Sequence, residues 1–247
     1  MQKQQLEIYA AGSLNSCFNA IKDKWQQQLD NAQLAFRFGP AGLLYQEIVN
    51  GDRPHIFCSA NKGWPQSLFE AGLTTEPSHF INNRLCCTVL KDSTIDKNNL
   101  IESFMQPDLK IGISTPKADP GGDYALEVFK NFEKLYKGAF ERLLQQAQML
   151  VGGALINDAN IGLKKTLFDS LIHHQSDIII GYYSNAKQQC ELNSAFRLIE
   201  LPDALAVNSH YYMAIMNPTT KAAQQFGNYL LSPETRKIFE DFGFSIV

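Results

Sequence analysis

Short apolar runs alternate with amphipathic segments along the first part of the chain, and this alternation restricts the possible folds strongly. The apolar runs are residues 6–11 (LEIYAA), 34–38 and 55–60 (HIFCSA), and the amphipathic segments are residues 14–29, a stretch from Pro40, and 65–71. Short apolar runs are typical of buried strands, whereas the apolar residues of the longer segments recur at helical spacing. Strands that alternate with helices form a mostly parallel sheet. The sequence therefore predicts an α/β fold.

The middle of the chain continues this pattern with some changes. Residues 83–90 (NRLCCTVL) form a continuous apolar run that predicts a strand, and the polar residues 91–99 after it predict a loop. We expect the chain to cross from a first lobe to a second near this point. Further along, the pattern predicts a helix over 141–149 and a buried strand over 177–183, with a return crossing near Pro202.

Residues 111–129 (IGISTPKADPGGDYALEVF) are expected to form a strand, a loop and a helix. Asp119 suits the N-cap of that helix, and Pro120 suits its first position, where a missing N–H costs nothing. Gly121 then falls at the second helical position, with an unpaired N–H and no side chain to block a ligand. Since helix starts attract anions, the pattern outlines a small anion site at Gly121 and Gly122.

A second stretch, residues 36–49 (FRFGPAGLLYQEIV), repeats this arrangement. Here Gly39 is the expected N-cap and Pro40 the first helical residue, so that Ala41 and Gly42 present bare amides. Two such helix starts suggest two walls of one cleft. The alternative is that both are ordinary capped helices, and the pattern alone leaves the two interpretations open.

Two further residues lie at the ends of predicted strands. Ser13 follows the first strand and is either the N-cap of the next helix or a residue that faces a ligand. Tyr182 lies at the end of the strand predicted over 177–183. In open α/β sheets ligands bind outside the carboxyl ends of the strands, which favours both residues as ligand contacts.

A glycine-containing loop at residues 150–162 precedes a helix that is expected to begin near Leu163. Lys164 lies close to that start, where a positive charge opposes the helix dipole unless an anion is near. The alternative is that Lys164 is a solvated surface lysine.

Composition narrows the range of partners. The 247 residues carry a net charge of −3 with dispersed Lys and Arg, so we expect no nucleic-acid partner. The chain has five cysteines with neither CxxC nor Cys/His spacing, so we expect them to be structural or incidental and predict no metal site and no cofactor. No run is apolar enough to span a membrane, and a strand begins almost at once. The chain is therefore expected to be cytoplasmic or to have lost a signal before this numbering begins.

A series of motifs along nearly the whole chain resembles the periplasmic molybdate-binding proteins of ABC importers. The motifs are AAGSL, FGPAGLLYQEI, FCSANKGWPQSLFEAGL, NRLC, STPKADPGGDYALEVF, LVGG, GYYSNA and LLSPETRKIFEDFGF, and their order and spacing carry the resemblance. The resemblance implies a type II periplasmic-binding-protein fold with two α/β lobes joined by a two-strand hinge. Lobe I would be residues 1–83 with 203–247, and lobe II residues 84–202.

The resemblance also implies a function. Proteins of this family hold a tetrahedral dianion with hydroxyls and backbone amides and close about a hinge. Carried over by position, the ligand contacts would be Ser13, Ala41, Gly42, Gly121, Gly122, Gly162, Lys164 and Tyr182. The chain would then be a monomeric periplasmic protein, its signal sequence removed, that delivers molybdate or tungstate to a membrane permease.

This chain departs from the family pattern at both helix starts. Residues Pro40, Ala41 and Gly42 stand where relatives often have serines, so that only amides remain there. Asp119 and Asp123 flank the Gly121 turn and would repel a dianion unless they cap the helix and point away. The ligand could therefore be a different anion or a small organic acid.

Two other classes of function stay open at this level. Asp119, Asp123, Tyr182 and Lys164 would suffice for acid–base chemistry, but we expect no enzyme, because no nucleophile–base pair, metal cluster or phosphate loop of known spacing occurs. The other class is a cytoplasmic ligand-sensing domain of the same fold, which the free cysteines favour.

Overall fold

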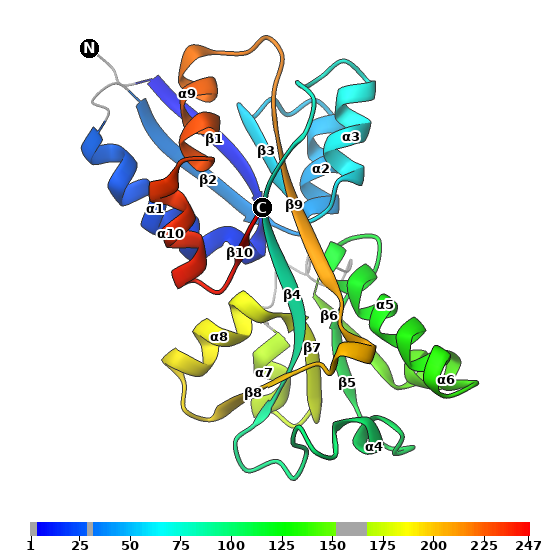
Figure 1. Cartoon of the computed structure of the whole chain (residues 1–247). Coiled ribbons are helices and arrows are strands. Elements are labelled where there is room, and N and C mark those ends of the chain that lie inside the picture. The colour runs from blue at the N-terminus through cyan, green and yellow to red at the C-terminus, as the bar shows by residue number, and fades with distance from the viewer. Residues whose placement is uncertain (1–3, 29–31, 152–166) are drawn as a thin grey trace. The chain divides into compact units, whose positions relative to one another are not determined.

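The structure is a computed structural model, and it describes residues 4–28, 32–151 and 167–247. The chain forms two compact units (Figure 1). Unit 1 comprises Met1–Asn83 and Ser209–Val247, and unit 2 comprises Arg84–Asn208. The second boundary therefore lies after Asn208, whereas the sequence placed it at 202/203. The intervening turn packs in unit 2, where the Ala206 carbonyl accepts a hydrogen bond from Asn131 Nδ2 (3.4 Å).

Unit 1 is a mixed sheet flanked by helices. Its strands are β1 (Gln4–Ala11), β2 (Ala32–Gly39), β3 (Ile56–Ser59), β9 (Asn208–Ile215) and β10 (Ser245–Ile246). Its helices are η1 (Gly12–Leu14), α1 (Asn15–Gln28), α2 (Ala41–Val49), α3 (Gly63–Glu70), α9 (Lys221–Leu230) and α10 (Pro233–Asp241). Strand β1 is parallel to both β2 and β3, and β9 is antiparallel to β3.

Aromatic side chains fill one face of the unit 1 sheet. Phe18 of α1 lies 5.5 Å from Phe36 of β2 and 6.3 Å from Phe239 of α10, measured between ring centroids. Trp25 of α1 lies 5.2 Å from Phe226 of α9. Buried aromatic rings supply much of the apolar area that holds such layers together. Helices α1, α9 and α10 therefore share one core, and α2 and α3 lie on the other side of the sheet (Figure 1).

Unit 2 repeats the arrangement around a second sheet. Its elements are β4 (Ser78–Leu90), which enters from unit 1, α4 (Leu100–Phe104), β5 (Ile111–Ser114), α5 (Pro120–Leu135), α6 (Ala139–Gln146), β6 (Ala147–Val151), α7 (Leu167–Ile172), β7 (Ile178–Tyr182), α8 (Tyr183–Leu192), β8 (Phe196–Glu200) and η3 (Asp203–Leu205). Strand β5 is parallel to β6 and β7, and β4 is antiparallel to β7 and β8. Three parallel strands thus form the centre of each unit.

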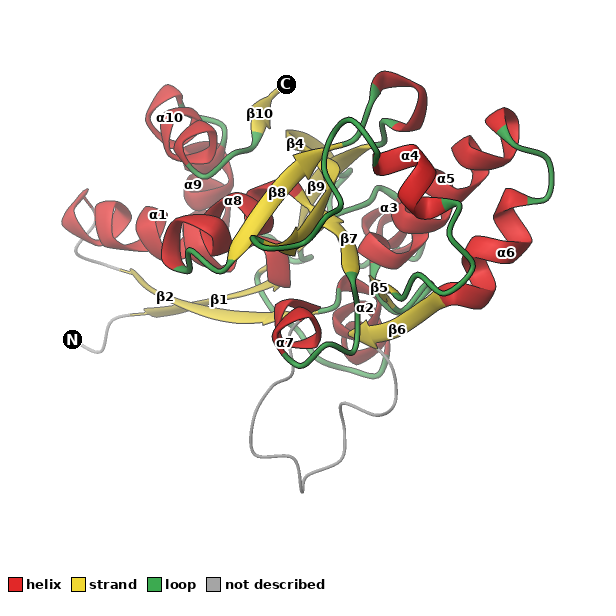
Figure 2. Cartoon of the chain, turned by 90° about the horizontal axis from the view of Figure 1, so that it is seen from below, coloured by secondary structure: helices red, strands yellow, loops and turns green. Residues whose placement is uncertain are grey.

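The prediction of a helix over 141–149 was wrong about where the helix ends. Helix α6 stops at Gln146, and the next residues form β6, which pairs with β5 through partners such as Ile111 and Ala147 (Figure 2). The segment keeps a helical pattern of apolar residues, but the strand is formed because its backbone groups pair with a strand far away in sequence. Helix α8 likewise begins at Tyr183, which the sequence placed at the end of the strand predicted over 177–183.

Candidate functional site

The loops that follow β1 and β2 lie side by side in unit 1. These strands are parallel and in register, with Ala11 opposite Gly39 at their last residues. A methyl group placed on Gly12 would lie 3.8 Å from the Gly39 oxygen, which shows how closely the two backbones approach. The carboxyl ends of parallel strands are where α/β proteins bind ligands. Ser13 and the start of α2 therefore belong to one corner of unit 1.

Ser13 does not cap a helix as the first interpretation proposed. It lies inside the helical turn η1, whose N-cap is Ala11, a residue without a capping side chain. Its hydroxyl lies instead 2.8 Å from the phenol oxygen of Tyr211 on β9, and the residue is only 6% exposed. The hydroxyl is thus held in one orientation by a strand distant in sequence.

Helix α2 starts one residue later than the sequence predicted. Pro40, not Gly39, is the N-cap, because its carbonyl accepts hydrogen bonds from Leu43 N (3.0 Å) and Leu44 N (3.1 Å). Ala41 and Gly42 become the first two helical residues, and both are buried.

The Ala41 and Gly42 amides are the clearest sign of a ligand site in unit 1. N–H groups in the first turn of a helix have no carbonyl partner within the helix. Within the part of the chain that the structure describes, neither amide finds a hydrogen-bond acceptor elsewhere. A buried donor without a partner costs about 1–3 kcal/mol, so such groups usually serve an acceptor that binds from outside. Two adjacent amides at a helix start suit an anion.

In unit 2 the predicted cap of α5 is confirmed. Asp119 is the N-cap and Pro120 the first helical residue. The expectation that the Gly121 amide is unpaired was wrong, because this N–H donates to Asp119 Oδ1 at 2.9 Å. The Gly122 amide donates to the Asp119 carbonyl, also at 2.9 Å. The side chain of the cap thus occupies the position that we had expected an anion to take.

The electrostatics of this loop depend on two carboxylates. Burial raises the pKa of Asp119, and hydrogen bonds from the Gly121 amide and the Ser114 hydroxyl oppose that rise. Burial also raises the pKa of Asp123, whose Oδ1 accepts a hydrogen bond from Lys117 N at 3.0 Å. Lys117 has a positive φ of 68°, a conformation that this bond helps to hold. Both carboxylates therefore shape the loop itself.

Tyr182 lies at the same corner of unit 2 as Gly121. It is the last residue of β7 and the N-cap of α8, and it is 7% exposed. A methyl group on Gly121 would lie 3.2 Å from Tyr182 Cε2 and 3.4 Å from Ser114 Oγ. The structure therefore brings these two predicted contacts together, whereas Gly162 and Lys164 lie outside the described residues.

Gly122 has a packing role that the sequence did not reveal. A methyl group there would lie 2.4 Å from the Ser114 oxygen and 2.5 Å from Pro116 N, both backbone atoms. Only glycine lets α5 begin this close to the end of β5. Its amide bonds to Asp119, so the geometry explains Gly122 without a ligand.

Tyr211 and Asn61 are polar residues at these strand ends that the sequence did not indicate. Asn61 Oδ1 accepts hydrogen bonds from Ser59 Oγ (3.1 Å) and Trp64 N (3.3 Å), and so ties the end of β3 to α3. An asparagine directly after a buried strand was a local signal for this role. Tyr211 had no such signal, since its partner Ser13 is 198 positions away.

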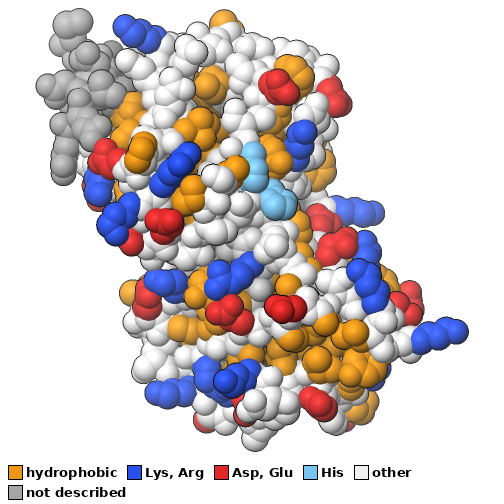
Figure 3. Space-filling view, viewed as in Figure 1, with side chains coloured by type: hydrophobic (Ala, Val, Ile, Leu, Met, Phe, Trp, Pro, Cys, Tyr) orange, Lys and Arg blue, Asp and Glu red, His pale blue; other side chains and the backbone are white. Residues whose placement is uncertain are grey.

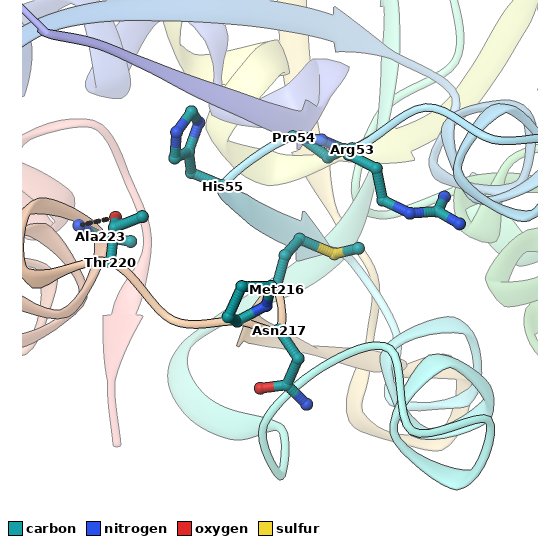
Figure 4. Close-up of a pocket in the computed structure, with 8 residues that line it drawn as sticks. Arg53, Pro54, His55, Met216, Asn217, Thr220 and Ala223 are labelled. Carbon is teal, nitrogen blue, oxygen red and sulfur yellow. Dashed lines mark hydrogen bonds between the residues drawn. The ribbon is translucent and has the colours of Figure 1, made fainter.

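A cavity of about 340 Å³ also lies in unit 1, at the other end of β3 (Figure 4). Its polar groups already have partners. His55 Nδ1 accepts from Glu7 N (3.1 Å), Arg53 Nη1 donates to the Ile48 carbonyl (2.8 Å), and Thr220 caps α9. Arg53 and His55 point in different directions in Figure 4, so they do not converge on a ligand. We therefore place the candidate site at the strand ends and not in this cavity.

Comparison with known proteins identifies the family of the chain. The family model described as "Bacterial extracellular solute-binding protein" matches residues 6–245. The chain belongs to this family. An uncharacterised protein of Pasteurella multocida is 35% identical over 97% of this chain and 98% of its own length. Molybdate-binding protein ModA of Escherichia coli is 24% identical over 98% of this chain and 89% of its own.

Solved structures show the same fold. The periplasmic molybdate-binding protein of Azotobacter vinelandii superposes with a TM-score of 0.76 at 15% identity, covering 98% of this chain and 99% of its own. The predicted type II periplasmic-binding-protein fold and the resemblance to molybdate-binding proteins are confirmed.

The family also gives a broad class of function. The chain is a solute-binding protein of the ABC-importer class, and its family is described as one of bacterial extracellular proteins. Among the described residues, no helix is both long and apolar enough to cross a membrane.

Proposed function

We propose that this protein captures an oxyanion outside the cytoplasmic membrane and delivers it to an ABC permease, with molybdate or tungstate as the first candidates. The observation that supports this most is the pair of buried amides at Ala41 and Gly42, beside the oriented hydroxyl of Ser13. Helix-start amides can replace the hydration shell of an anion without a counter-charge. Relatives with molybdate in their names point the same way.

The remaining predicted contacts belong to the same proposal. We propose Tyr182, Gly162 and Lys164 as further ligand contacts, and hinge closure as the response to binding. The protein would act as a monomer.

Ligand screening by thermal unfolding tests this function. The purified protein is heated with molybdate, tungstate, sulfate, phosphate or small carboxylates. A ligand at a hundredfold excess over its dissociation constant stabilises the native state by about 2.7 kcal/mol. Stabilisation by molybdate and tungstate alone would support both parts of the proposal. A panel without any shift would contradict anion capture.

Proline substitution tests the amides directly. Ala41→Pro removes the N–H of the first helical residue, where proline fits a helix well. Pro40 has ψ of 124°, which suits a residue before proline. We expect anion affinity to fall by at least about tenfold, since a hydrogen bond to a charged group contributes about 1.5–3 kcal/mol. Lys221→Pro makes the same change at the first residue of α9 and should leave affinity unchanged.

Asp119 favours a second candidate, an anion that carries its own hydrogen-bond donor. Its carboxylate accepts a hydrogen bond from the Gly121 amide, and burial raises its pKa, as does the like charge of Asp123. Like unit charges 4 Å apart repel by about 4 kcal/mol at an effective dielectric constant of 20. A bare dianion would therefore bind poorly beside ionised Asp119, whereas a protonated or hydroxyl-bearing anion could donate to it.

Comparing sulfate with hydrogen phosphate and glycerol phosphate separates the two candidates. Sulfate and molybdate carry no donor at neutral pH, whereas the two phosphates do. If Asp119 faces the ligand, Asp119→Asn should raise affinity for sulfate or molybdate and lower it for the phosphates. Asp123→Asn is the control, because Asp123 bonds to Lys117 instead. If the ratio of sulfate affinity to phosphate affinity is the same in the wild type, Asp119→Asn and Asp123→Asn, Asp119 has no role in choosing the ligand.

A further inference from the structure

Two histidines and an asparagine of unit 1 converge away from the anion-binding residues. His79 Nε2 lies 2.7 Å from Asn82 Oδ1, and His210 Nδ1 lies 2.6 Å from the same oxygen. The two imidazole rings are 5.2 Å apart between centroids and almost perpendicular, at 85°. Two ring nitrogens thus point at the Asn82 oxygen, and the proposed anion binding uses none of these three side chains.

The backbone places these side chains on the outward face of two strands. Phe80 and Ile81 are both buried, so the alternation along β4 shifts there and leaves His79 and Asn82 on the same outer side. On β9, His210 alternates with buried Tyr211, whose hydroxyl points to Ser13. The histidines therefore lie on the opposite face of β9 from the Ser13 contact. Figure 3 shows histidine side chains side by side on this surface.

Tyr212 holds the His79 ring in place. The two rings are stacked, with centroids 4.9 Å apart and planes inclined by 19°. His79 is also half-buried, so its Nε2 direction is fixed by packing as well as by the bond to Asn82. A side chain whose orientation is set before binding loses little entropy when it becomes a ligand.

The chemistry of these groups suits a transition metal. A neutral imidazole nitrogen is a good ligand for Zn²⁺, Cu²⁺ and Ni²⁺, at about 2.0–2.1 Å for zinc. Each ring donates an N–H to Asn82 Oδ1, which can only accept. A change of tautomer that moves this proton to the other ring nitrogen leaves a lone pair beside that oxygen. In the described part of the chain no carboxylate is hydrogen-bonded to these side chains, so hard cations such as Mg²⁺ have little to bind.

We propose that His79 Nε2 and His210 Nδ1 chelate one divalent late transition-metal ion, with Asn82 Oδ1 as a third, weaker ligand. Among the described residues no group of three or more His, Cys, Asp or Glu could hold a metal. The remaining coordination positions are therefore open to water, and Cu²⁺ binds more tightly than Zn²⁺, as expected for two imidazoles. An ion there links β4 to β9, the strands by which the chain enters and leaves unit 2.

Calorimetric titration of untagged, EDTA-treated protein with Cu²⁺ and Zn²⁺ tests the site. We expect one ion per chain at this site. His210→Gln should weaken binding by at least about tenfold, the least that losing even an outer-shell partner of a metal site usually costs. His173→Gln removes another exposed histidine, in unit 2, and should leave affinity unchanged. Asn82→Asp should tighten binding, because it replaces a neutral ligand with a carboxylate.

Thermal unfolding of the variants shows whether a loss of metal affinity results from misfolding. His210 is exposed, so His210→Gln should unfold at the wild-type temperature in EDTA. The proposal is overturned if the wild type binds neither ion, if His210→Gln keeps full affinity, or if the loss follows His173→Gln. Anion binding is measured separately, so a failure here leaves the proposed function untouched.

Discussion

The Ser13 hydroxyl lies 2.8 Å from the Tyr211 phenol oxygen, and both residues are buried. This contact joins the turn after β1 to the strand that returns from unit 2. Asn83 Nδ2 lies 3.5 Å from the same phenol oxygen, so three polar groups meet inside unit 1. Because the contact fixes Ser13 beside the start of α2, it orients a hydroxyl that accompanies the Ala41 and Gly42 amides.

Replacing Tyr211 with phenylalanine should therefore affect stability. Tyr211→Phe keeps the ring and its packing but leaves the buried Ser13 hydroxyl without this partner. We expect the free energy of unfolding to fall by about 1–2 kcal/mol, the usual effect of losing one buried hydrogen bond. Urea unfolding measures it. Tyr212→Phe is the matched control, since its hydroxyl makes no hydrogen bond within the described residues, and an equal loss there would contradict the assignment.

The glycines at the start of α5 should respond differently to alanine. At Gly122 a methyl group would lie 2.4 Å from a backbone oxygen, so Gly122→Ala forces the helix start to move. We expect a loss of about 1–3 kcal/mol or more, as for overpacked cores. At Gly121 the nearest atoms belong to side chains at 3.2–3.4 Å, so Gly121→Ala should cost less. Thermal unfolding of the two variants measures both losses. A larger loss for Gly121→Ala than for Gly122→Ala would contradict this geometry.

Local sequence patterns predicted most helices and strands, because the spacing of apolar residues that distinguishes them involves only residues close together in the sequence. The predictions failed where contacts with residues distant in the sequence determine the local structure. Strand β6 exists because Ala147 pairs with Ile111, and the helical spacing of its own residues could not show this. The α2 cap was misplaced by one residue because proline fits both positions. Only the bonds to the Pro40 carbonyl distinguish them.

The candidate site was predicted less completely than the fold. The sequence indicated Ser13 and Ala41, since strand ends and helix starts are local features. It did not indicate Tyr211, whose hydroxyl reaches Ser13 only through sheet pairing. It also left open where Asp119 would point, because a capping carboxylate and a ligand compete for the same Gly121 amide.

Asp119 should make stability depend on pH. Burial raises the pKa of its carboxyl in the folded protein, so folding favours the protonated form. The contribution is most favourable below the unfolded-state pKa and is lost as pH rises through the folded-state pKa. Asp119→Asn keeps a good N-cap but removes the buried charge. Relative to wild type, the variant should therefore become more stable as pH rises from 4 to 8.

Thermal unfolding of both proteins across that range measures the difference. The informative quantity is the gap in melting temperature between the variant and the wild type, because it cancels the titration of all other groups. A gap that narrows as pH rises would mean that the hydrogen bonds from Gly121 and Ser114 outweigh burial.

Thiol modification should show one reactive cysteine in the native protein. Cys17, Cys58, Cys86 and Cys87 are at most 1% exposed, and burial raises the pKa of each, so little thiolate forms. Cys190 is only partly buried. Burial raises its pKa, and a hydrogen bond with the Leu198 backbone opposes that rise. We expect a thiol reagent at pH 8 to modify Cys190 first and the other four only as fast as the protein opens, with all five reacting in urea. Cys190→Ser should remove the fast phase, and rapid modification of a second thiol would contradict the burial of the other four.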